Sequence, residues 1–312
     1  MSEMTTAYSL RPPTRADAVL VVDIMNTCQA ALGDEPDMSV EELLKDWAGA
    51  DLDDEAVLVV GPDGQVVGFA DLMNRRYVQV NVYAYALPGS YQAAVFDRLR
   101  LWGETWAASH KHLGEGVEQT EVHFFRRAND EAACVALKSA GYENVRTHYV
   151  MAAELIEAPP EPVWPEGVSV RTYRPGEDDD AVFLGGEESF QDMWNRPPST
   201  KERWLQPAQA ESFDPTLWFL PNDTTTGDVC GVCLCSVVAG VGEVDILGIR
   251  RPWRRQGLGL ALLQHAFAVF WQRGVRTARL TVDASSPTGA PRLYERAGFR
   301  VEKQYARYMK RV

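Results

Sequence analysis

The same order of predicted secondary-structure elements occurs twice along the chain, and this repetition constrains the fold more than any other feature. Each half opens with a short alternating strand, at residues 8–11 and 168–173, followed by a helical stretch, a hairpin, a further strand and a long amphipathic helix. Each half closes with a short helix that a glycine stops, and then a last strand. A period of roughly 160 residues indicates a duplicated domain and not a solenoid repeat.

A proline-rich segment separates the two halves. Residues 157–167 contain four prolines, which remove backbone donors and exclude a helix or an inner strand. A chain of 312 residues is also long for one core and comfortable for two. We therefore expect one α/β domain over residues 1–157, a linker over residues 158–167 and a second α/β domain over residues 168–312.

The composition excludes several classes of partner. A net charge of −13 argues against a general affinity for nucleic acid or anionic membranes, because both need a basic surface. No stretch approaches the roughly 20 apolar residues that cross a bilayer, and residues 1–13 lack the basic start and apolar run of a secretory signal. We expect a cytoplasmic monomer or homodimer that binds neither nucleic acid nor a membrane.

The chain has five cysteines and no export signal, which indicates that the cysteines are reduced thiols. Cys230 and Cys233 form a C-x-x-C pair, which in another context is a metal knuckle or a redox pair, but no second C-x-x-C or histidine pair accompanies it. We favour the simpler interpretation, an apolar strand in which small cysteines fill the core. No metal site is expected.

A basic loop lies between a predicted strand, residues 243–249, and a predicted helix, residues 260–272. It contains four arginines within six residues and two glycines. This order places free backbone N–H groups and the positive end of a helix dipole at one point, which favours a phosphate, and arginines add forked donors. The alternative is a solvated basic turn. No lysine follows the glycines as in a Walker A loop, and Leu262 occupies the third glycine position of a dinucleotide fingerprint, so both of those motifs are disfavoured.

Two motifs at their family spacing resemble the GNAT N-acetyltransferase superfamily. Arg254, Gly257 and Gly259 match its Q/R-x-x-G-x-G/A acetyl-CoA loop, and residues 280–299 resemble its next strand and its L-Y-x-x-x-G-F helix. The match covers residues 168–312, whereas the first half matches only in element order and in its Ala-Gly-Tyr ending. The resemblance implies two tandem GNAT-like domains, each a mixed, splayed sheet flanked by helices, in a layout similar to that of the mycothiol synthase group with a degenerate first domain.

The resemblance also implies that acetyl-CoA is the co-substrate. Its pantetheine arm would lie in the gap between two parting strands and its pyrophosphate on residues 254–260, while Ser286 falls where many members carry a cofactor-contacting asparagine. The cofactor-binding residues that we expect are Leu247, Gly248, Ile249, Arg254, Arg255, Gln256, Gly257, Leu258, Gly259, Leu260 and Ser286.

Members of this superfamily transfer acetyl directly to an amine that must first lose its proton. A lysine-like ammonium has a pKa about six units above that of a glutamate, so a carboxylate base needs a raised pKa, a water relay or an unusually acidic amine. Glu243 and Asp245 alternate along one strand, and we expect Glu243 to be the base or amine anchor, with Glu188 second. The alternative is that these carboxylates are solvated or cap backbone. We expect His265 to be packed and not catalytic.

Tyr294 matches the family tyrosine that protonates the departing thiolate. A phenol with a pKa of about 10 lies only about 1.5 units above a thiol, which suits general-acid transfer. The alternative is an aromatic side chain that packs the last helix. Backbone N–H groups near residues 247–249 would stabilise the developing oxyanion.

The first half lacks these features. Its loop, residues 84–94, has one glycine and no arginine, and Lys138 is aligned with Tyr294, so we expect this half to shape the acceptor pocket without ordinary CoA binding. The leading hypothesis is an N-acetyltransferase acting on a small primary amine. The alternative is a non-catalytic acyl-CoA-binding regulator, and protein-lysine acetylation would need an open groove.

Overall fold

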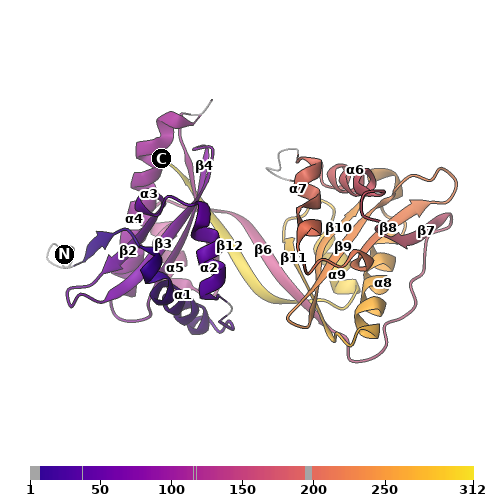
Figure 1. Ribbon diagram of the computed structural model, residues 1–312, viewed down its shortest axis with the longest axis horizontal. Helices are drawn as coiled ribbons and strands as arrows, with labels where there is room; N and C mark the ends of the chain where they lie inside the picture. Colours follow the sequence, from indigo (N-terminus) through magenta and orange to yellow (C-terminus); the bar gives the residue numbers. More distant parts are fainter. Residues whose placement is uncertain (1–7, 37, 115, 117, 194–198) are drawn as a thin grey trace. The chain divides into compact units, whose positions relative to one another are not determined.

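The computed structural model describes residues 8–36, 38–114, 116, 118–193 and 199–312. The chain forms two compact units (Figure 1). The first unit contains Met1–Thr147 and Gln304–Val312, and the second contains His148–Lys303. Residues 1–7, part of the expected first domain, lie outside the described residues.

The first unit is a mixed sheet with helices on both faces. Its described strands lie in the order β1, β2, β3, β4, β5, β12, antiparallel except for β4 and β5. One core lies between the sheet and α4 and α5, and a second lies under α1 and α2. The strands are β1 (Ser9–Arg11), β2 (Ala56–Val60), β3 (Val66–Arg75), β4 (Gln79–Ala86), β5 (Glu121–Arg127) and β12 (Arg300–Arg311), and the helices are α1 (Ala18–Ala31), α2 (Val40–Asp46), α3 (Leu52–Glu55), α4 (Gln92–His110) and α5 (Glu131–Ser139).

The second unit repeats this arrangement. Its described strands lie in the order β7, β8, β9, β10, β11, β6, antiparallel except for β10 and β11. Helices α8 and α9 pack on one face of the sheet and α6 and α7 on the other (Figure 1). The strands are β6 (Glu143–Glu154), β7 (Val168–Thr172), β8 (Trp218–Asp223), β9 (Gly231–Val238), β10 (Val241–Ile249) and β11 (Thr277–Asp283), and the helices are α6 (Asp179–Ser189), α7 (Lys201–Leu205), α8 (Leu258–Gln272) and α9 (Ala290–Arg296).

Each unit takes its last strand from the other half of the sequence. Residues 148–154 of β6 pair with β11, and residues 305–311 of β12 pair with β5. Both strands are 12 residues long, so each extends over about 40 Å and begins in one unit and ends in the other. The compact units therefore group these strands differently from the ranges 1–157 and 168–312. Residues 158–167 belong to the second unit, where Trp164 packs edge-on against His265 at 5.7 Å between ring centroids.

The sheet of the second unit is splayed between its two parallel strands. β10 and β11 pair only at Gly242 with Ala278 and at Glu243 with Arg279. A bulge interrupts the pairing of β10 with β9 between Val244 and Ile246, and such an extra residue bends the strand. The predicted fold class, two tandem α/β units with mixed, splayed sheets flanked by helices, is confirmed.

The cysteines of β9 and its approach lie in the core. Cys230, Cys233 and Cys235 are at most 2% exposed, among the apolar side chains under α8 and α9. All five cysteines are free thiols. Among the described residues, no group of three or more His, Cys, Asp or Glu side chains is arranged to hold a metal ion. Their burial agrees with the core-filler interpretation.

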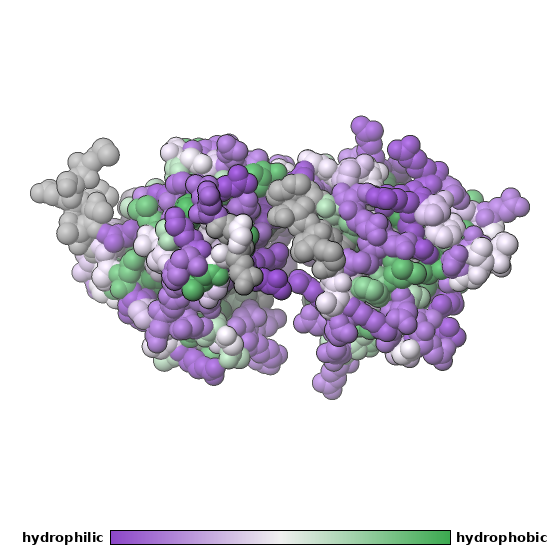
Figure 2. Space-filling model, turned by 90° about the horizontal axis from the view of Figure 1, so that it is seen from above, coloured by the Kyte–Doolittle hydropathy of each residue, from purple (hydrophilic) through white to green (hydrophobic). Residues whose placement is uncertain are grey.

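The visible surface of each unit is mostly hydrophilic, with apolar side chains in small separate areas (Figure 2). Of the helices in the described part of the chain, none is sufficiently long and apolar to span a membrane.

Candidate active site

The end of β10 has an open backbone edge. The N–H of Arg250 donates to the Cys230 carbonyl at 2.9 Å, on the β9 side. Because alternate residues of a strand turn their backbone groups to opposite edges, Gly248 also faces β9, whereas Leu247 and Ile249 face the gap that β11 leaves. A Cβ atom on Gly231 would lie 2.2 Å from the Gly248 carbonyl oxygen, which shows how closely β9 and β10 approach there. Leu247 therefore presents both its backbone groups, and Ile249 its N–H, where an extended chain could pair, while the Ile249 carbonyl already accepts from Arg254.

Helix α8 begins after this edge and a short 3-10 turn, Arg251–Trp253, and it has no side-chain cap. Gly257 is its N-cap residue, with φ of 88°, and Arg255 has φ of 62°. Within the described part of the chain, no backbone acceptor pairs with the N–H groups of residues 255–259. The first N–H groups of a helix have no partner inside it, and together with the helix dipole they attract an anion. Gln256, Leu258, Gly259 and Leu260 lie in this loop and first turn, as the loop motif predicted.

The two arginines expected at the pyrophosphate have different environments. Arg254 donates to the carbonyls of Ile249 and Ser189, both at 2.9 Å, and its Nη1 lies 2.7 Å from Asp192 Oδ2. Its guanidinium therefore ties the end of β10 to the end of α6, and its donors are already engaged. Arg255 is exposed. Of the two side chains, Arg255 is the one that the structure leaves accessible to a phosphate.

Glu188 is engaged in an ion pair and lies far from Glu243. Its Oε2 accepts from Arg250 Nε at 2.6 Å, while Arg250 Nη1 donates to the Val229 carbonyl at 2.6 Å. Arg250 follows β10, whereas Glu243 is near its beginning, so roughly 20 Å of strand separates Glu243 from the arginine that holds Glu188. The structure does not bring the two candidate bases together.

Glu243 lies where β10 and β11 separate. It pairs with Ser236 of β9 and with Arg279 of β11 in the last pair before the gap. Burial raises the pKa of its carboxyl, the Arg279 charge opposes this, and the negative charges of Asp245 and Glu302 add to it. A raised pKa reduces the gap between this carboxylate and an ammonium, which is the property that a carboxylate base needs.

Tyr294 lies on the opposite face of the sheet from Glu243. A Cβ atom on Gly242 would lie 2.6 Å from the Phe270 ring of α8, so Gly242 faces α8 and its neighbour Glu243 faces away. Tyr294, only 7% exposed, belongs to the α8 side of the core. Burial, and to a smaller extent the Cys233 thiol, raises the pKa of its hydroxyl, which therefore remains protonated at neutral pH. Cys233 is the β9 partner of Leu247, so Tyr294 lies near the open edge.

Two other expectations concern a serine and a histidine. Ser286 lies in the turn after β11, where its N–H donates to the Asp283 carbonyl at 3.0 Å and its hydroxyl lies 3.0 Å from that of Thr288. His265 packs edge-on against Phe219 at 4.7 Å between centroids, and burial lowers its pKa. His265 is thus packed, as we expected.

Sequence reasoning missed three charged residues around the site. Arg279 and Glu302 form an ion pair at 3.2 Å beside Glu243, and Asp192 bonds Arg251 and Arg254. The alternating pattern of β11 offered a signal for Arg279, because parallel pairing of β11 with β10 places this arginine opposite Glu243. Asp192 gave none, because only the fold brings α6 to the loop.

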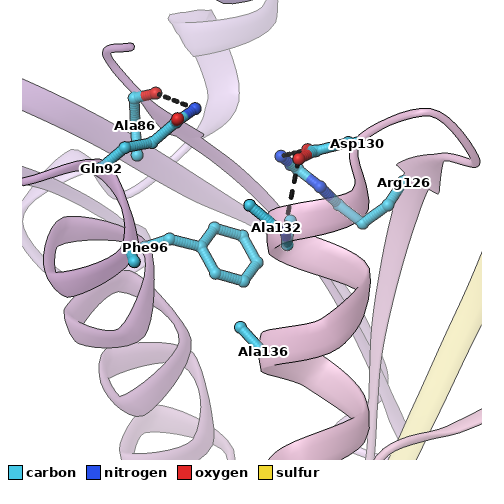
Figure 3. Close-up of a pocket in the computed structure, with 9 residues that line it drawn as sticks. Ala86, Gln92, Phe96, Arg126, Asp130, Ala132 and Ala136 are labelled. Atoms are coloured by element: carbon cyan, nitrogen blue, oxygen red, sulfur yellow. Dashed lines mark hydrogen bonds and ion pairs between the residues drawn. The ribbon is translucent and has the colours of Figure 1, made fainter. Parts of the chain in front are cut away.

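The corresponding edge in the first unit is occupied by the chain itself. The Leu87 N–H donates to the Val67 carbonyl of β3 at 3.0 Å, so Ala84 and Ala86 face the β5 side. Arg126 of β5 donates to the Ala84 carbonyl at 2.6 Å. It also pairs with Asp130 at 2.5 Å (Figure 3).

The cleft at this place is small and lined largely by alanines. The space between its lining residues, counted together with the part that is open solvent, is about 280 Å³. Gln92 of α4 donates to the Ala86 carbonyl at 3.3 Å, and Phe96 points toward α5 (Figure 3). The two carbonyls that would pair with an extended ligand are thus already hydrogen-bonded.

The equivalent of Tyr294 in the first unit is Leu137 and not Lys138. The Phe299 N–H donates to the Tyr294 carbonyl at 3.0 Å, and the Tyr142 N–H makes the same bond to Leu137 at 3.0 Å. Leu137 is fully buried. The alignment with Lys138 was displaced by one residue, and the corrected one places an apolar side chain where the second unit has a hydroxyl.

Comparisons with known proteins agree with this geometry. Residues 185–299 match the model of the acetyltransferase (GNAT) family. The chain is 39% identical over 252 residues to the mycothiol acetyltransferase of Streptomyces coelicolor, covering 76% of this chain and 73% of that protein. The crystal structure of a GCN5-related N-acetyltransferase from Sphaerobacter thermophilus is 45% identical and superposes with a TM-score of 0.85, covering 97% of this chain and 95% of the other.

The tandem arrangement also has a solved counterpart. A tandem GNAT protein from the clavulanic acid biosynthesis pathway shares the fold, with 13% identity and a TM-score of 0.68 over 97% of this chain and 98% of that one. The strand order, the open edge of β10 and the family match agree with one another. The chain belongs to the GNAT acetyltransferase family and is an acyl-CoA-dependent acetyltransferase.

Proposed function

We propose that the second unit transfers the acetyl group of acetyl-CoA to the primary amine of a small molecule. The observation that carries this proposal is the continuity of two features, the open edge at Leu247 and Ile249 and the uncapped start of α8 after Gly257. An extended amide-containing arm pairs with such an edge, and a diphosphate fits such a helix start. Both parts of a CoA molecule would thus be held along one continuous track.

Carboxylates on the Glu243 face support a cationic acceptor. Glu243 and Glu302 lie beside one guanidinium, that of Arg279, and the charge of Asp245 also acts on Glu243, so negative charge predominates among these four. Burial raises the pKa of both Glu243 and Asp245. An ammonium group would be attracted there and could lose its proton to Glu243. Glu188, paired with Arg250, is better suited to holding α6 at the end of β10.

Glu243 and Tyr294 serve opposite proton transfers in this proposal. Acetyl-CoA supplies a thioester carbonyl, the amine forms a bond to its carbon, and the carbon–sulfur bond breaks. Glu243 takes the amine proton on one face of the sheet, and Tyr294 gives a proton to the departing sulfur on the other. Backbone N–H groups at the open edge would stabilise negative charge on the carbonyl oxygen.

The first test is release of CoA thiol on incubation with acetyl-CoA and a panel of amines. Because relatives are named mycothiol acetyltransferases, a mycothiol-related amine is the first compound to test, followed by amino sugars and amino-acid amides. We expect turnover with at least one amine and a loss of about 10²-fold or more in Tyr294→Phe. Calorimetric CoA binding without turnover on any amine, and no effect of Tyr294→Phe, would instead indicate a non-catalytic acyl-CoA-binding regulator.

A further inference from the structure

Arg279 lies between two carboxylates and binds them unequally. Its Nε lies 3.2 Å from Glu302 Oε2 and its Nη2 lies 3.5 Å from Glu302 Oε1, so the forked side of the guanidinium faces Glu302. Glu243 Oε1 lies 4.0 Å from Nη1, on the remaining side. A planar guanidinium binds one carboxylate strongly through two parallel N–H groups, and a second one only through what is left. Arg279 therefore contacts Glu302 more closely, and through more N–H groups, than it contacts Glu243.

Strand register places Arg279 beside Glu243. Arg279 stands opposite Glu243 in the last parallel pair of β10 and β11, which fixes the two side chains as neighbours. Glu302 comes from β12, so the chain brings a competing carboxylate to the same arginine from a different strand. Each of the three side chains is between 26% and 38% exposed, so all three can be reached by a ligand.

We propose that Arg279 is a positioning residue for Glu243, and that Glu302 keeps Glu243 available to the acceptor amine by holding the guanidinium fork away from it. This inference rests on the proposed function, in which Glu243 accepts the amine proton. If Arg279 bound Glu243 through its fork, the carboxylate oxygens would be occupied by guanidinium N–H groups. With Glu302 present, Glu243 keeps oxygen lone pairs free for the substrate.

The charges around Glu243 agree with this assignment. Burial raises the pKa of Glu243, Arg279 lowers it, and Asp245 and Glu302 raise it. Removing the Arg279 charge should therefore raise the pKa of Glu243. Removing the Glu302 charge should lower it, both directly and because the freed guanidinium turns to Glu243. Substitutions of the two partners of this ion pair are thus expected to shift the pKa of Glu243 in opposite directions.

The experiment measures the carboxyl pKa of Glu243 by NMR in protein labelled with ¹³C at glutamate carboxyls, with Glu243→Gln for assignment. We expect Arg279→Met to raise this pKa and Glu302→Gln to lower it, each by about 0.5 to 1 unit. Arg279→Lys, which keeps the charge but loses the fork, should lie close to the native protein. Arg203→Met and Glu211→Gln, at exposed positions of the second unit, are charge-matched controls and should leave the pKa unchanged.

The acidic limb of the kcat/KM profile for the amine should move in the same directions, with the KM for acetyl-CoA constant. Shifts of the same sign in Arg279→Met and Glu302→Gln, or no shift in either, would overturn the inference. The NMR titration requires no turnover. Opposite pKa shifts in the two variants would therefore support the charge arrangement even if Glu243→Gln left turnover unchanged. Unchanged turnover in Glu243→Gln would reject Glu243 as the base, which is a failure of the proposed function alone.

Discussion

The two units share a strand order but differ at one edge. In the second unit, no described residue pairs with the backbone of Leu247 on the gap side, although Arg254 donates to the Ile249 carbonyl, and the long helix has a glycine N-cap. In the first unit, Arg126 and Gln92 donate to carbonyls of the equivalent strand, and Tyr91 is the N-cap of the long helix. The two edges thus differ at Leu247 against Ala84 and in the residue that caps the long helix, and we propose that these differences decide which unit holds the cofactor.

The largest effect that separates the units should come from one carboxylate in each whose pKa is raised. Glu243→Gln removes the proton acceptor of the second unit, and we expect kcat/KM for the amine to fall by about 10²- to 10⁴-fold. Asp71→Asn makes the same change in the first unit, at a carboxyl whose pKa burial raises to about 7, and turnover should not change. Steady-state kinetics on both variants checks this. Equal losses in the two variants would mean that both units take part in catalysis.

The second effect concerns the loops before the long helices. Gly257 has φ of 88°, so Gly257→Val forces a branched side chain into a left-handed conformation and distorts the anion cradle. We expect CoA affinity, measured by calorimetry, to fall about ten- to a hundredfold. Gly89→Val at the corresponding loop of the first unit, with φ of 153°, is the control and should leave CoA affinity unchanged. A comparable loss there would contradict the assignment of the cofactor to the second unit.

A third test addresses the self-occupied edge directly. Arg126→Ala removes the partner of Asp130, which is only 8% exposed, and frees the Ala84 carbonyl. Breaking such a pair leaves an uncompensated charge, so we expect the free energy of unfolding to fall by about 2 to 4 kcal/mol in denaturant titrations. The stoichiometry of CoA binding should remain one per chain, because the first unit still lacks a glycine cradle. Two CoA molecules bound to the native protein would show that Arg126 does not close this edge.

The smallest effect is a pH dependence confined to the first unit. Burial raises the pKa of Asp71 to about 7, and the charge of Asp46 adds to the shift. Because this folded-state pKa lies above that of the unfolded chain, the folded protein holds the proton more tightly, and stability falls as the pH rises from about 4 to about 7. Asp71→Asn cannot ionise and should not show this fall.

We therefore expect Asp71→Asn to be more stable relative to the native protein at pH 8 than at pH 5, by about 2 kcal/mol in thermal or urea unfolding. Glu35→Gln, at an exposed position of the same unit, is the control and should show the native pH dependence. A constant difference between Asp71→Asn and the native protein across this range would reject a protonated Asp71.

The sequence located the features that depend on neighbours along the chain. The alternating strands, the loop between β10 and α8 and the glycine that ends α9 are local patterns. In the structure, each lies at or next to the residues where the pattern predicted it. The family motif therefore located, without coordinates, the loop that we propose to hold the cofactor. Local patterns were also sufficient to recognise two copies of one fold, because both copies keep the same order of elements.

Tertiary structure decided which strand completes each sheet and which charges meet. Two copies of one fold offer each last strand two similar partners, so no local pattern could assign β6 to β11 or β12 to β5. The engagement of Arg254 with Asp192, and of Arg279 with Glu302, likewise depends on segments distant in sequence. Sequence alone determined the elements and their chemistry, because these follow from local periodicity and turn residues. The partner of each arginine was decided by packing, because a guanidinium pairs with whichever carboxylate the fold brings within reach.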